Sequence, residues 1–271
     1  MVLPVHDVNP TRRTPVVTYA LVLVNVVAFL LSPLAAAPFV GDAGGSQACR
    51  QSAFFDHYAA EPKELLHNRQ DSQGVTGAVG RDPATGEVGC VVKQPPPFSK
   101  VPFLSVLTAM FLHGGWLHLL GNMLFLYVFG NNVEDRLGRL KYLLFYLGCG
   151  YVATYGFSVF APGSSTPLVG ASGAIAGVLG AYLVLFPRAR IWSLLTFLFF
   201  LPVRLPAWLV LGSWFVLQYL YFRGAGLAGG SGVAYGAHVI GFIVGVLVAL
   251  PYRGSGQQRR LQPRWGPYAS R

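Results

Sequence analysis

The chain is built from long apolar blocks separated by shorter polar segments. Several blocks reach the roughly 20 residues that a helix needs to cross about 30 Å of hydrocarbon at 1.5 Å per residue. The pattern predicts an all-α membrane protein, a bundle of six transmembrane helices. We expect these helices at about residues 16–36, 104–130, 142–161, 169–186, 205–222 and 234–251.

One apolar stretch, Ile191 to Val203, does not fit this scheme. It is short and is flanked by Arg188, Arg190 and Arg204. Its length suits an interfacial or re-entrant segment better than a full crossing. A crossing there would also reverse every later helix and place Arg204 outside, against the rule that basic residues stay inside. Six crossings are therefore expected.

Composition supports a membrane protein, because 53% of the 271 residues are hydrophobic and only 11% are charged, against roughly a quarter charged in soluble domains. The net charge of +10 is compatible with nucleic-acid binding until the basic residues are located. They precede the first apolar block, follow the second and fourth, and fill the tail. This is the distribution of a chain with both termini inside, so no nucleic-acid partner is expected.

The apolar blocks divide the chain into five parts. The first block is expected to be a retained helix rather than a cleaved signal peptide. Cys49 and Cys90 fall outside the membrane, where a disulfide can form, and the sequence leaves their pairing open. The parts are a cytoplasmic tail at 1–15, the first helix at 16–36, an extracytoplasmic loop at 37–103 that is partly ordered at best, a core at 104–251 and a basic cytoplasmic tail at 252–271.

Ionisable residues are nearly absent from the predicted helices, which contain no Asp, Glu, Lys or Arg. Because such groups are costly inside a bilayer, each one that occurs there is a candidate for function. The main candidates are His113, His118 and His238. His118 and Asn122 are four residues apart, so they lie on one face of the second helix.

Small residues mark the fourth and sixth helices. Gly170, Ser172 and Gly173 open the fourth, while Gly241 and Gly245 follow the histidine of the sixth. Small residues at three- and four-residue spacing let two helix backbones approach closely, so these helices are expected to touch. Helix rise places Ser172 and the sixth-helix histidine each roughly 7 Å below the outer boundary.

A serine, two histidines and an asparagine in one layer are sufficient for acyl transfer. An imidazole can take the proton of Ser172 and later donate it to the leaving amine. Asn122, His118 and the Ser172 backbone N–H can stabilise the oxyanion. Because no carboxylate lies in the helices to orient His238, the sequence favours a Ser–His dyad over a triad.

These residues carry a family resemblance. The run from His113 to Asn122, then Gly170-Ala-Ser172-Gly173, then the run from His238 to Gly245 resemble, in order, the signature of rhomboid intramembrane serine proteases. The resemblance covers roughly residues 100–251. It implies a six-helix rhomboid-like bundle that cleaves transmembrane protein substrates within the lipid bilayer, without cofactor or metal.

The resemblance also implies roles for single residues. Ser172 would be the nucleophile and His238 the base, with His118 and Asn122 at the oxyanion site. Glu134 and Arg136 resemble a structural polar cluster of the family. The fifth helix resembles the family's lateral gate, through Trp208, Trp214 and Gln218.

Two positions depart from the pattern of many family members. Leu104-Ser105 stands where many have Trp-Arg, and Ala176 stands where some have a tyrosine that stacks on the catalytic histidine. Neither change removes the chemistry. They affect the anchoring of the outer loop and the support of His238.

Other functions fit less well. A metalloprotease using His113, His118 and His238 would lack HExxH and a carboxylate base, and His113, on another face of the helix, is assigned a structural role. A transporter would show inverted repeats, which we do not find. A non-catalytic rhomboid-like protein that binds clients is the remaining alternative. The abundance of Ala, Gly and Arg suggests a bacterial plasma membrane.

Overall fold

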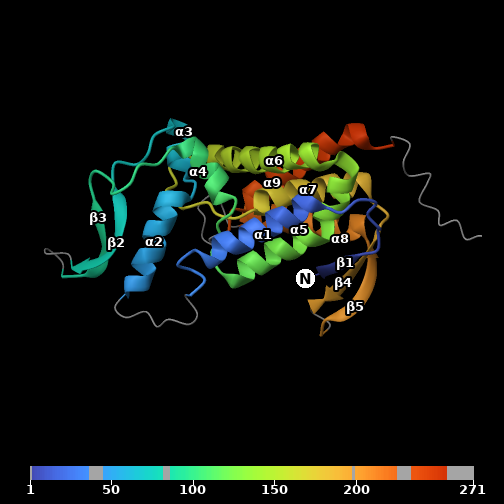
Figure 1. The fold of residues 1–271 in the computed structure, drawn as a ribbon, viewed down its shortest axis with the longest axis horizontal. Coiled ribbons are helices and arrows are strands. Elements are labelled where there is room, and N and C mark those ends of the chain that lie inside the picture. Colours follow the sequence, from blue (N-terminus) through green and yellow to red (C-terminus); the bar gives the residue numbers. More distant parts are fainter. Residues whose placement is uncertain (1, 37–44, 82–85, 197–198, 225–232, 255–271) are drawn as a thin grey trace, which may run out of the picture.

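A computed structural model of the chain describes residues 2–36, 45–81, 86–196, 199–224 and 233–254. Its helices run side by side in a central bundle, with a small α/β cap at one end and a sheet at the other (Figure 1). The elements in chain order are β1 Val2–Asp7, α1 Val16–Leu30, α2 Ser46–Tyr58, α3 Pro62–His67, β2 Gly74–Arg81, β3 Val88–Lys93, α4 Pro102–Ala109, α5 Trp116–Leu137, α6 Arg139–Phe160, α7 Ser172–Leu185, β4 Arg190–Leu195, β5 Leu201–Pro206, α8 Ala207–Gly224 and α9 Tyr235–Ala249, followed by a short 3₁₀ turn, η3 Leu250–Tyr252.

Two of the described helices are long and apolar enough to cross a membrane by themselves: Arg139–Phe160, and α9 with its 3₁₀ extension, Tyr235–Tyr252. Val16–Leu30 and Ser172–Leu185 are apolar but shorter. Large apolar side chains are also exposed on the bundle, including Leu117, Leu140 and Trp208. Such exposure suits a lipid surround, since soluble proteins rarely show large apolar patches. The count of six crossings stays a prediction.

The predicted second helix, 104–130, is wrong as a single element. The structure has α4 up to Ala109 and α5 from Trp116, with a turn between them that includes His113. Gly114 and Gly115 lie in this turn. Two successive glycines favour a break because each loses more backbone freedom in a helix than any other residue.

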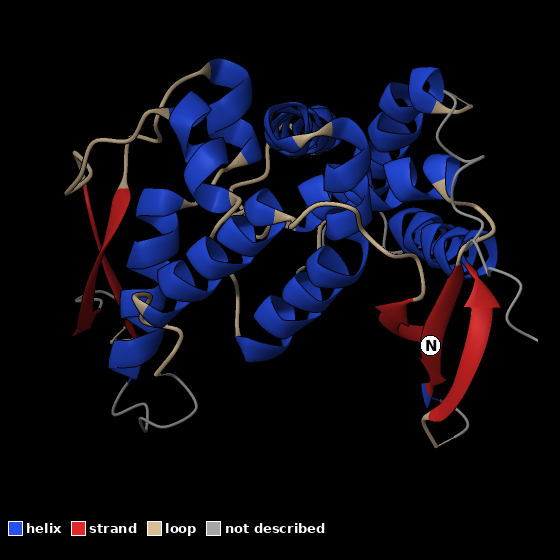
Figure 2. Cartoon of the chain, turned by 45° about the vertical axis from the view of Figure 1, so that its right-hand side comes forward, coloured by secondary structure: helices blue, strands red, loops and turns tan. Residues whose placement is uncertain are grey.

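The segment expected as a partly ordered loop, 37–103, is largely folded in the part the structure describes. Helices α2 and α3 and the hairpin β2–β3 form the cap (Figure 2). A disulfide joins Cys49 of α2 to Cys90 of β3. The positions 37–44 and 82–85 of this predicted loop lie outside the described residues.

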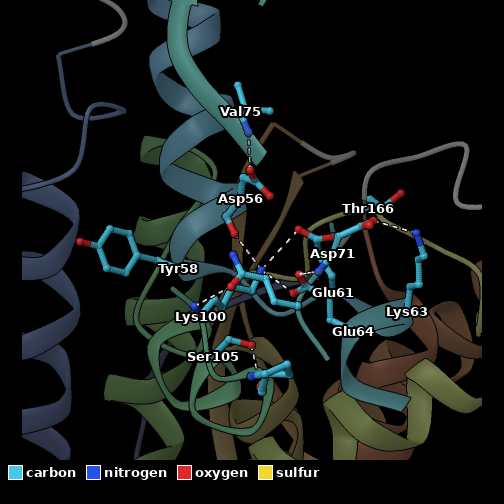
Figure 3. Close-up of polar contacts among 12 residues, drawn as sticks. Asp56, Tyr58, Glu61, Lys63, Glu64, Asp71, Val75, Lys100, Ser105 and Thr166 are labelled. Atoms are coloured by element: carbon cyan, nitrogen blue, oxygen red, sulfur yellow. Dashed lines mark hydrogen bonds and ion pairs between the residues drawn. The ribbon is translucent and has the colours of Figure 1, made fainter. Parts of the chain in front are cut away.

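A buried cation organises the cap. The Nζ of Lys100 lies 2.6 Å from a carboxylate oxygen of Glu64 and 3.4 Å from one of Glu61, and it donates to the Asp56 carbonyl at 2.7 Å (Figure 3). A buried charge is tolerated only when partners surround it in this way. The polar composition of the segment therefore serves a folded core, not a solvated loop.

The apolar stretch around 191–203 contributes two antiparallel strands, β4 and β5, in place of a helix. Its partner is β1, within the predicted cytoplasmic tail, and the strand order is β1-β4-β5. Asp7 of β1 is buried and accepts hydrogen bonds from Asn132 at 2.8 Å and from Tyr182 at 2.5 Å. These bonds fix the sheet to α5 and α7.

Helices α7 and α9 pack backbone to backbone. A Cβ added at Gly241 would collide with the carbonyl oxygen of Gly173, and one at Gly245 with that of Gly177. The predicted contact between the fourth and sixth helices is present in this form. The predicted tail beyond residue 254 lies outside the described residues.

The polar cluster at the end of α5 caps other helices. The Glu134 carboxylate accepts hydrogen bonds from the backbone N–H groups of Val17 and Thr18, at 3.0 and 2.7 Å. Those groups open α1, where N–H donors have no intrahelical partner and a negative charge is favourable. Arg136 donates to the Tyr252 carbonyl at the end of α9, at 2.7 Å. Both residues are therefore placed to hold helix ends.

Candidate active site

Ser172 is the first residue of α7. Gly170, two positions earlier, has a φ of +115°, a conformation that residues with a side chain rarely adopt. The chain thereby turns sharply into the helix, and its first backbone N–H groups lack intrahelical partners. Ser172 stands at this turn with its side chain partly exposed.

The Oγ of Ser172 lies 2.8 Å from the Nε2 of His238, in the first turn of α9. This is hydrogen-bonding distance for a nucleophile and its base. The contact depends on the close packing of α7 and α9 that the glycines allow. The residues that the sequence predicts as a dyad are thus brought together.

The other ring nitrogen of His238 also has a partner. Its Nδ1 lies 2.7 Å from the Oε1 of Gln218, a buried side chain of α8. The rings of Trp214 and Tyr235 flank the imidazole, with centroids 6.0 and 6.2 Å away. A carboxamide and two aromatic rings therefore surround a histidine for which the sequence predicts no orienting carboxylate.

Sequence reasoning assigned Gln218 only to a gate. The available signal was its polarity, because it is an amide in the otherwise mostly apolar run of α8. Its contact with His238 depends on the rotation of α8 about its axis, which the sequence does not give. The tyrosine position of other family members, here Ala176, is fully buried in α7.

His118 lies in the first turn of α5, and its Nδ1 is 3.3 Å from the backbone N–H of Gly114. Since Nδ1 accepts this bond, the proton of a neutral ring is on Nε2. A Cβ at Gly170 would lie 2.9 Å from that Nε2. The Nε2–H donor therefore points toward the turn that carries Ser172.

Asn122 lies one turn further along α5, buried, with 8% of its surface exposed. Among the described residues its Nδ2 has no hydrogen-bond partner, and it lies 3.7 Å from where a Cβ of Gly170 would be. An unpaired buried donor is costly. Two donors, from His118 and Asn122, thus converge beside the start of α7.

His113 is buried next to His118. It has 1% of its surface exposed, and its ring centroid is 5.1 Å from that of His118. The structure places it in the α4–α5 turn, in contact with His118. In the described part of the chain, no group of three or more His, Cys, Asp or Glu side chains is arranged to hold a metal ion.

A small cavity of about 40 Å³ opens beside Ser172. Its lining includes Gly170, Thr154 of α6 and Met110 of the α4–α5 turn. A space of this size holds one or two water molecules when polar groups line it. The serine therefore has room for a small molecule in a space lined by residues of α6, α7 and α9.

Much of the chain is similar to known proteins. Residues 102–255 match the family described as the Rhomboid domain. The chain is 33% identical over 173 residues to "Rhomboid protein 1, mitochondrial" of Saccharomyces cerevisiae, covering 60% of this chain and 47% of that one. It is 40% identical over 78 residues to "Putative rhomboid protease YdcA" of Bacillus subtilis, covering 29% and 39%. The matched regions thus span less than half of each relative.

Another relative is also a mitochondrial protein by its name. "Presenilin-associated rhomboid-like protein A, mitochondrial" of Danio rerio is 35% identical over 97 residues, 35% of this chain and 25% of its own length. Because the relatives include mitochondrial and bacterial proteins, they do not support the expected bacterial plasma membrane. The Rhomboid domain covers more than half of the chain, which therefore belongs to the rhomboid family of helical, multi-pass membrane proteins.

Proposed function

We propose that the chain is an intramembrane serine endopeptidase that cleaves transmembrane protein substrates near the outer membrane boundary. The observation that carries this proposal is the 2.8 Å contact between Ser172 Oγ and His238 Nε2 at the start of α7. Two proteins with "rhomboid protease" in their names, from Bacillus subtilis, are among the relatives.

In the first step, Ser172 Oγ attacks the carbonyl carbon of the scissile bond while His238 Nε2 takes its proton. The imidazolium then donates that proton to the leaving amine, which frees the acyl-serine. Water, activated by the same nitrogen, hydrolyses this ester and restores the serine. The contact of Ser172 with His238 and the partial exposure of the serine support this sequence.

The oxyanion of each tetrahedral intermediate needs donors that are already in place. Three are at hand: the Nδ2 of Asn122, the Nε2–H of His118 and the backbone N–H of Ser172. The free donor of Asn122 supports this role most directly. An oxyanion would supply the partner that this buried amide lacks.

Substrate entry is assigned to the side of α8. This helix exposes Trp208 and much of its outer surface, and it faces α5 through Trp214 and Phe125, whose ring centroids are 6.4 Å apart. A cross-link between α8 and α5 should block cleavage of a transmembrane substrate. Unchanged cleavage after cross-linking would exclude this route.

The proposal includes six crossings with both termini inside, with the cap on the outer face. The cap end then carries Ser172, His238 and His118, each in the first turn of its helix. The serine layer lies close to water for the hydrolytic step. A bacterial plasma membrane remains part of the proposal on composition alone.

The proposal is tested by cleavage of a tagged single-span substrate in liposomes by the wild-type chain, Ser172→Ala and His238→Ala, with chelator present throughout. Loss of cleavage in both variants supports the dyad. Persistent cleavage by Ser172→Ala would overturn it. A wild-type chain that binds but does not cleave several such substrates would favour a client-binding member of the family.

A further inference from the structure

The partner of His238 on α8 decides which nitrogen of its ring carries the proton. A base for Ser172 must have a free lone pair on Nε2 and therefore a proton on Nδ1. The Oε1 of Gln218, 2.7 Å from Nδ1, accepts that proton in a hydrogen bond. The carboxamide thus selects the ring form that can deprotonate the serine.

We propose that Gln218 is a positioning residue for His238, and that it makes the competence of the base depend on the packing of α8 against α9. This inference rests on the proposed protease function. Gln218 takes the structural place of the carboxylate in a Ser-His-Asp triad, but without its charge. It therefore orients the ring and gives the imidazolium less stabilisation than a carboxylate would.

Burial makes this contact strong and specific. Gln218 is 9% exposed and meets the ring from α8, while Ser172 meets the opposite nitrogen from α7. Besides Ser172, two titratable side chains face the His238 ring in the part of the chain that the structure describes. They are His118 of α5 and Tyr235 of α9 itself. No charged group competes there for Nδ1.

The dependence on α8 follows from where Gln218 is attached. α8 carries both the glutamine and Trp214, which packs on His238 and on Phe242 of α9 with ring centroids 6.0 and 6.1 Å apart. Moving α8 away from α9 would withdraw both contacts together. The site is then complete when α8 is packed and loses its orienting bond when α8 is displaced.

The test uses the full chain in liposomes with Gln218→Met, which keeps the side-chain length but lacks the amide oxygen, and Gln218→Glu, which restores a strong acceptor. Ser213→Ala is the matched control, because the Ser213 hydroxyl donates to the Val210 carbonyl of its own helix, at 3.1 Å, and not to His238. The readouts are kcat and KM for a tagged single-span substrate, and the rate at which a fluorophosphonate labels Ser172.

We expect Gln218→Met to lower kcat and the labelling rate by about ten- to a hundredfold, with KM within about twofold of the wild type. Gln218→Glu should recover most of the labelling rate. It should also move the acidic limb of the kcat profile to higher pH by about one unit, because a carboxylate stabilises the protonated ring. Ser213→Ala should match the wild type.

Wild-type kcat in Gln218→Met, or a change in its KM alone, would overturn the proposal. So would an acidic limb in Gln218→Glu that stays where the wild-type limb is, and this second variant decides the matter if the methionine variant does not fold. Failure of the dyad itself is seen separately, as cleavage that persists in Ser172→Ala. Nitrogen NMR of His238 gives an independent readout, because it shows which ring nitrogen carries the proton. We expect that proton on Nδ1 in the wild type.

Discussion

At the scale of single residues, the candidate site depends on the absence of one methyl group. Gly170 combines a φ of +115° with an approach so close that a Cβ would lie 2.9 Å from the Cε1 and Nε2 of His118. Its backbone N–H also donates to the Ala109 carbonyl at 2.9 Å, which ties the turn to α4. One glycine therefore positions both the serine and a donor of the proposed oxyanion site.

Gly170→Ala is expected to lower kcat by about a hundredfold, because a displaced His118 would no longer stabilise the oxyanion. The added strain should also cost about 1–3 kcal/mol of stability. Kinetics at a temperature where the variant is folded measure the first effect. Gly121→Ala on α5 is the control, since its Cβ would meet nothing within 4 Å; equal losses in both variants would contradict this account.

A second residue-scale prediction concerns Glu61 in the cap. Burial raises the pKa of its carboxyl from 4.5 to about 7, with Glu64 and Asp56 acting in the same direction and Lys100 opposing them. The folded state therefore binds this proton more tightly than the unfolded state. Binding of this proton therefore stabilises the folded state. The stabilisation is complete below pH 4.5 and is lost as pH rises through about 7.

Thermal unfolding of the cap, followed between pH 4.5 and 7, should show stability falling by on the order of 2 kcal/mol. Glu61→Gln should flatten this dependence, because an amide does not titrate. Lys63→Met is the control, since it removes a cap lysine whose ion pair, with Asp71 at 2.7 Å, lies at the surface. An unaltered slope in Glu61→Gln would show that another group is responsible.

At the scale of elements, the contact between α7 and α9 brings the serine and histidine together. Each helix exposes a glycine row to the carbonyl groups of the other, so the backbones meet without side chains between them. Such rows favour association of helices in lipid, where apolar burial gives no advantage. The distance between nucleophile and base is set by this contact.

Gly245→Val should separate these helices, because even a Cβ collides with the Gly177 carbonyl. We expect loss of both cleavage and fluorophosphonate labelling, together with a lower unfolding temperature in detergent. Gly148→Val on α6 is the matched change, with nothing within 4 Å of its Cβ. A fully active Gly245→Val would mean that other contacts hold α7 and α9 together and that the glycine row does not set the distance between serine and histidine.

The elements also show how far sequence reasoning reaches. The apolar blocks and small-residue spacing correctly indicated a helical membrane bundle in which the fourth and sixth helices touch. They missed the break at Gly114 because both sides are apolar, and they missed the β4–β5 hairpin because hydropathy does not separate a buried strand from a short helix. The fold of the cap could not be predicted from local sequence patterns, because it depends on contacts between distant residues. These are the Cys49–Cys90 disulfide and the ion pairs of the buried Lys100.

At the scale of the whole molecule, the two ends of the bundle differ in kind. One end carries the disulfide-linked cap, and the α6–α7 connection pairs with it through Ala60 and Leu168. The other end carries the β1-β4-β5 sheet and the capping residues Glu134 and Arg136. A disulfide favours the oxidising side of a membrane, so the cap end is expected to face outward.

Cysteine labelling tests this orientation. In a Cys149→Ser background, Ser165→Cys in the exposed α6–α7 connection should react with a membrane-impermeant maleimide on intact cells. Arg188→Cys, exposed at the opposite end of α7, should react only after the membrane is permeabilised. The reverse pattern would invert the topology, and equal reactivity before permeabilisation would contradict a crossing of the membrane by α7.

The sheet has a consequence for how the protein is made. β1 leaves the ribosome long before its partner strand β4, in which Ile191 pairs with Asp7. At about 5–20 residues per second, the strand waits on the order of 10–40 s before that partner has been synthesised. Until then the β1–β4 ladder cannot form, and the two side chains that donate to Asp7, those of Asn132 and Tyr182, follow it in the chain by 125 and 175 residues. Closure of the sheet is therefore a late event of biogenesis, because it requires β4 and the side chains of α5 and α7 that hold Asp7.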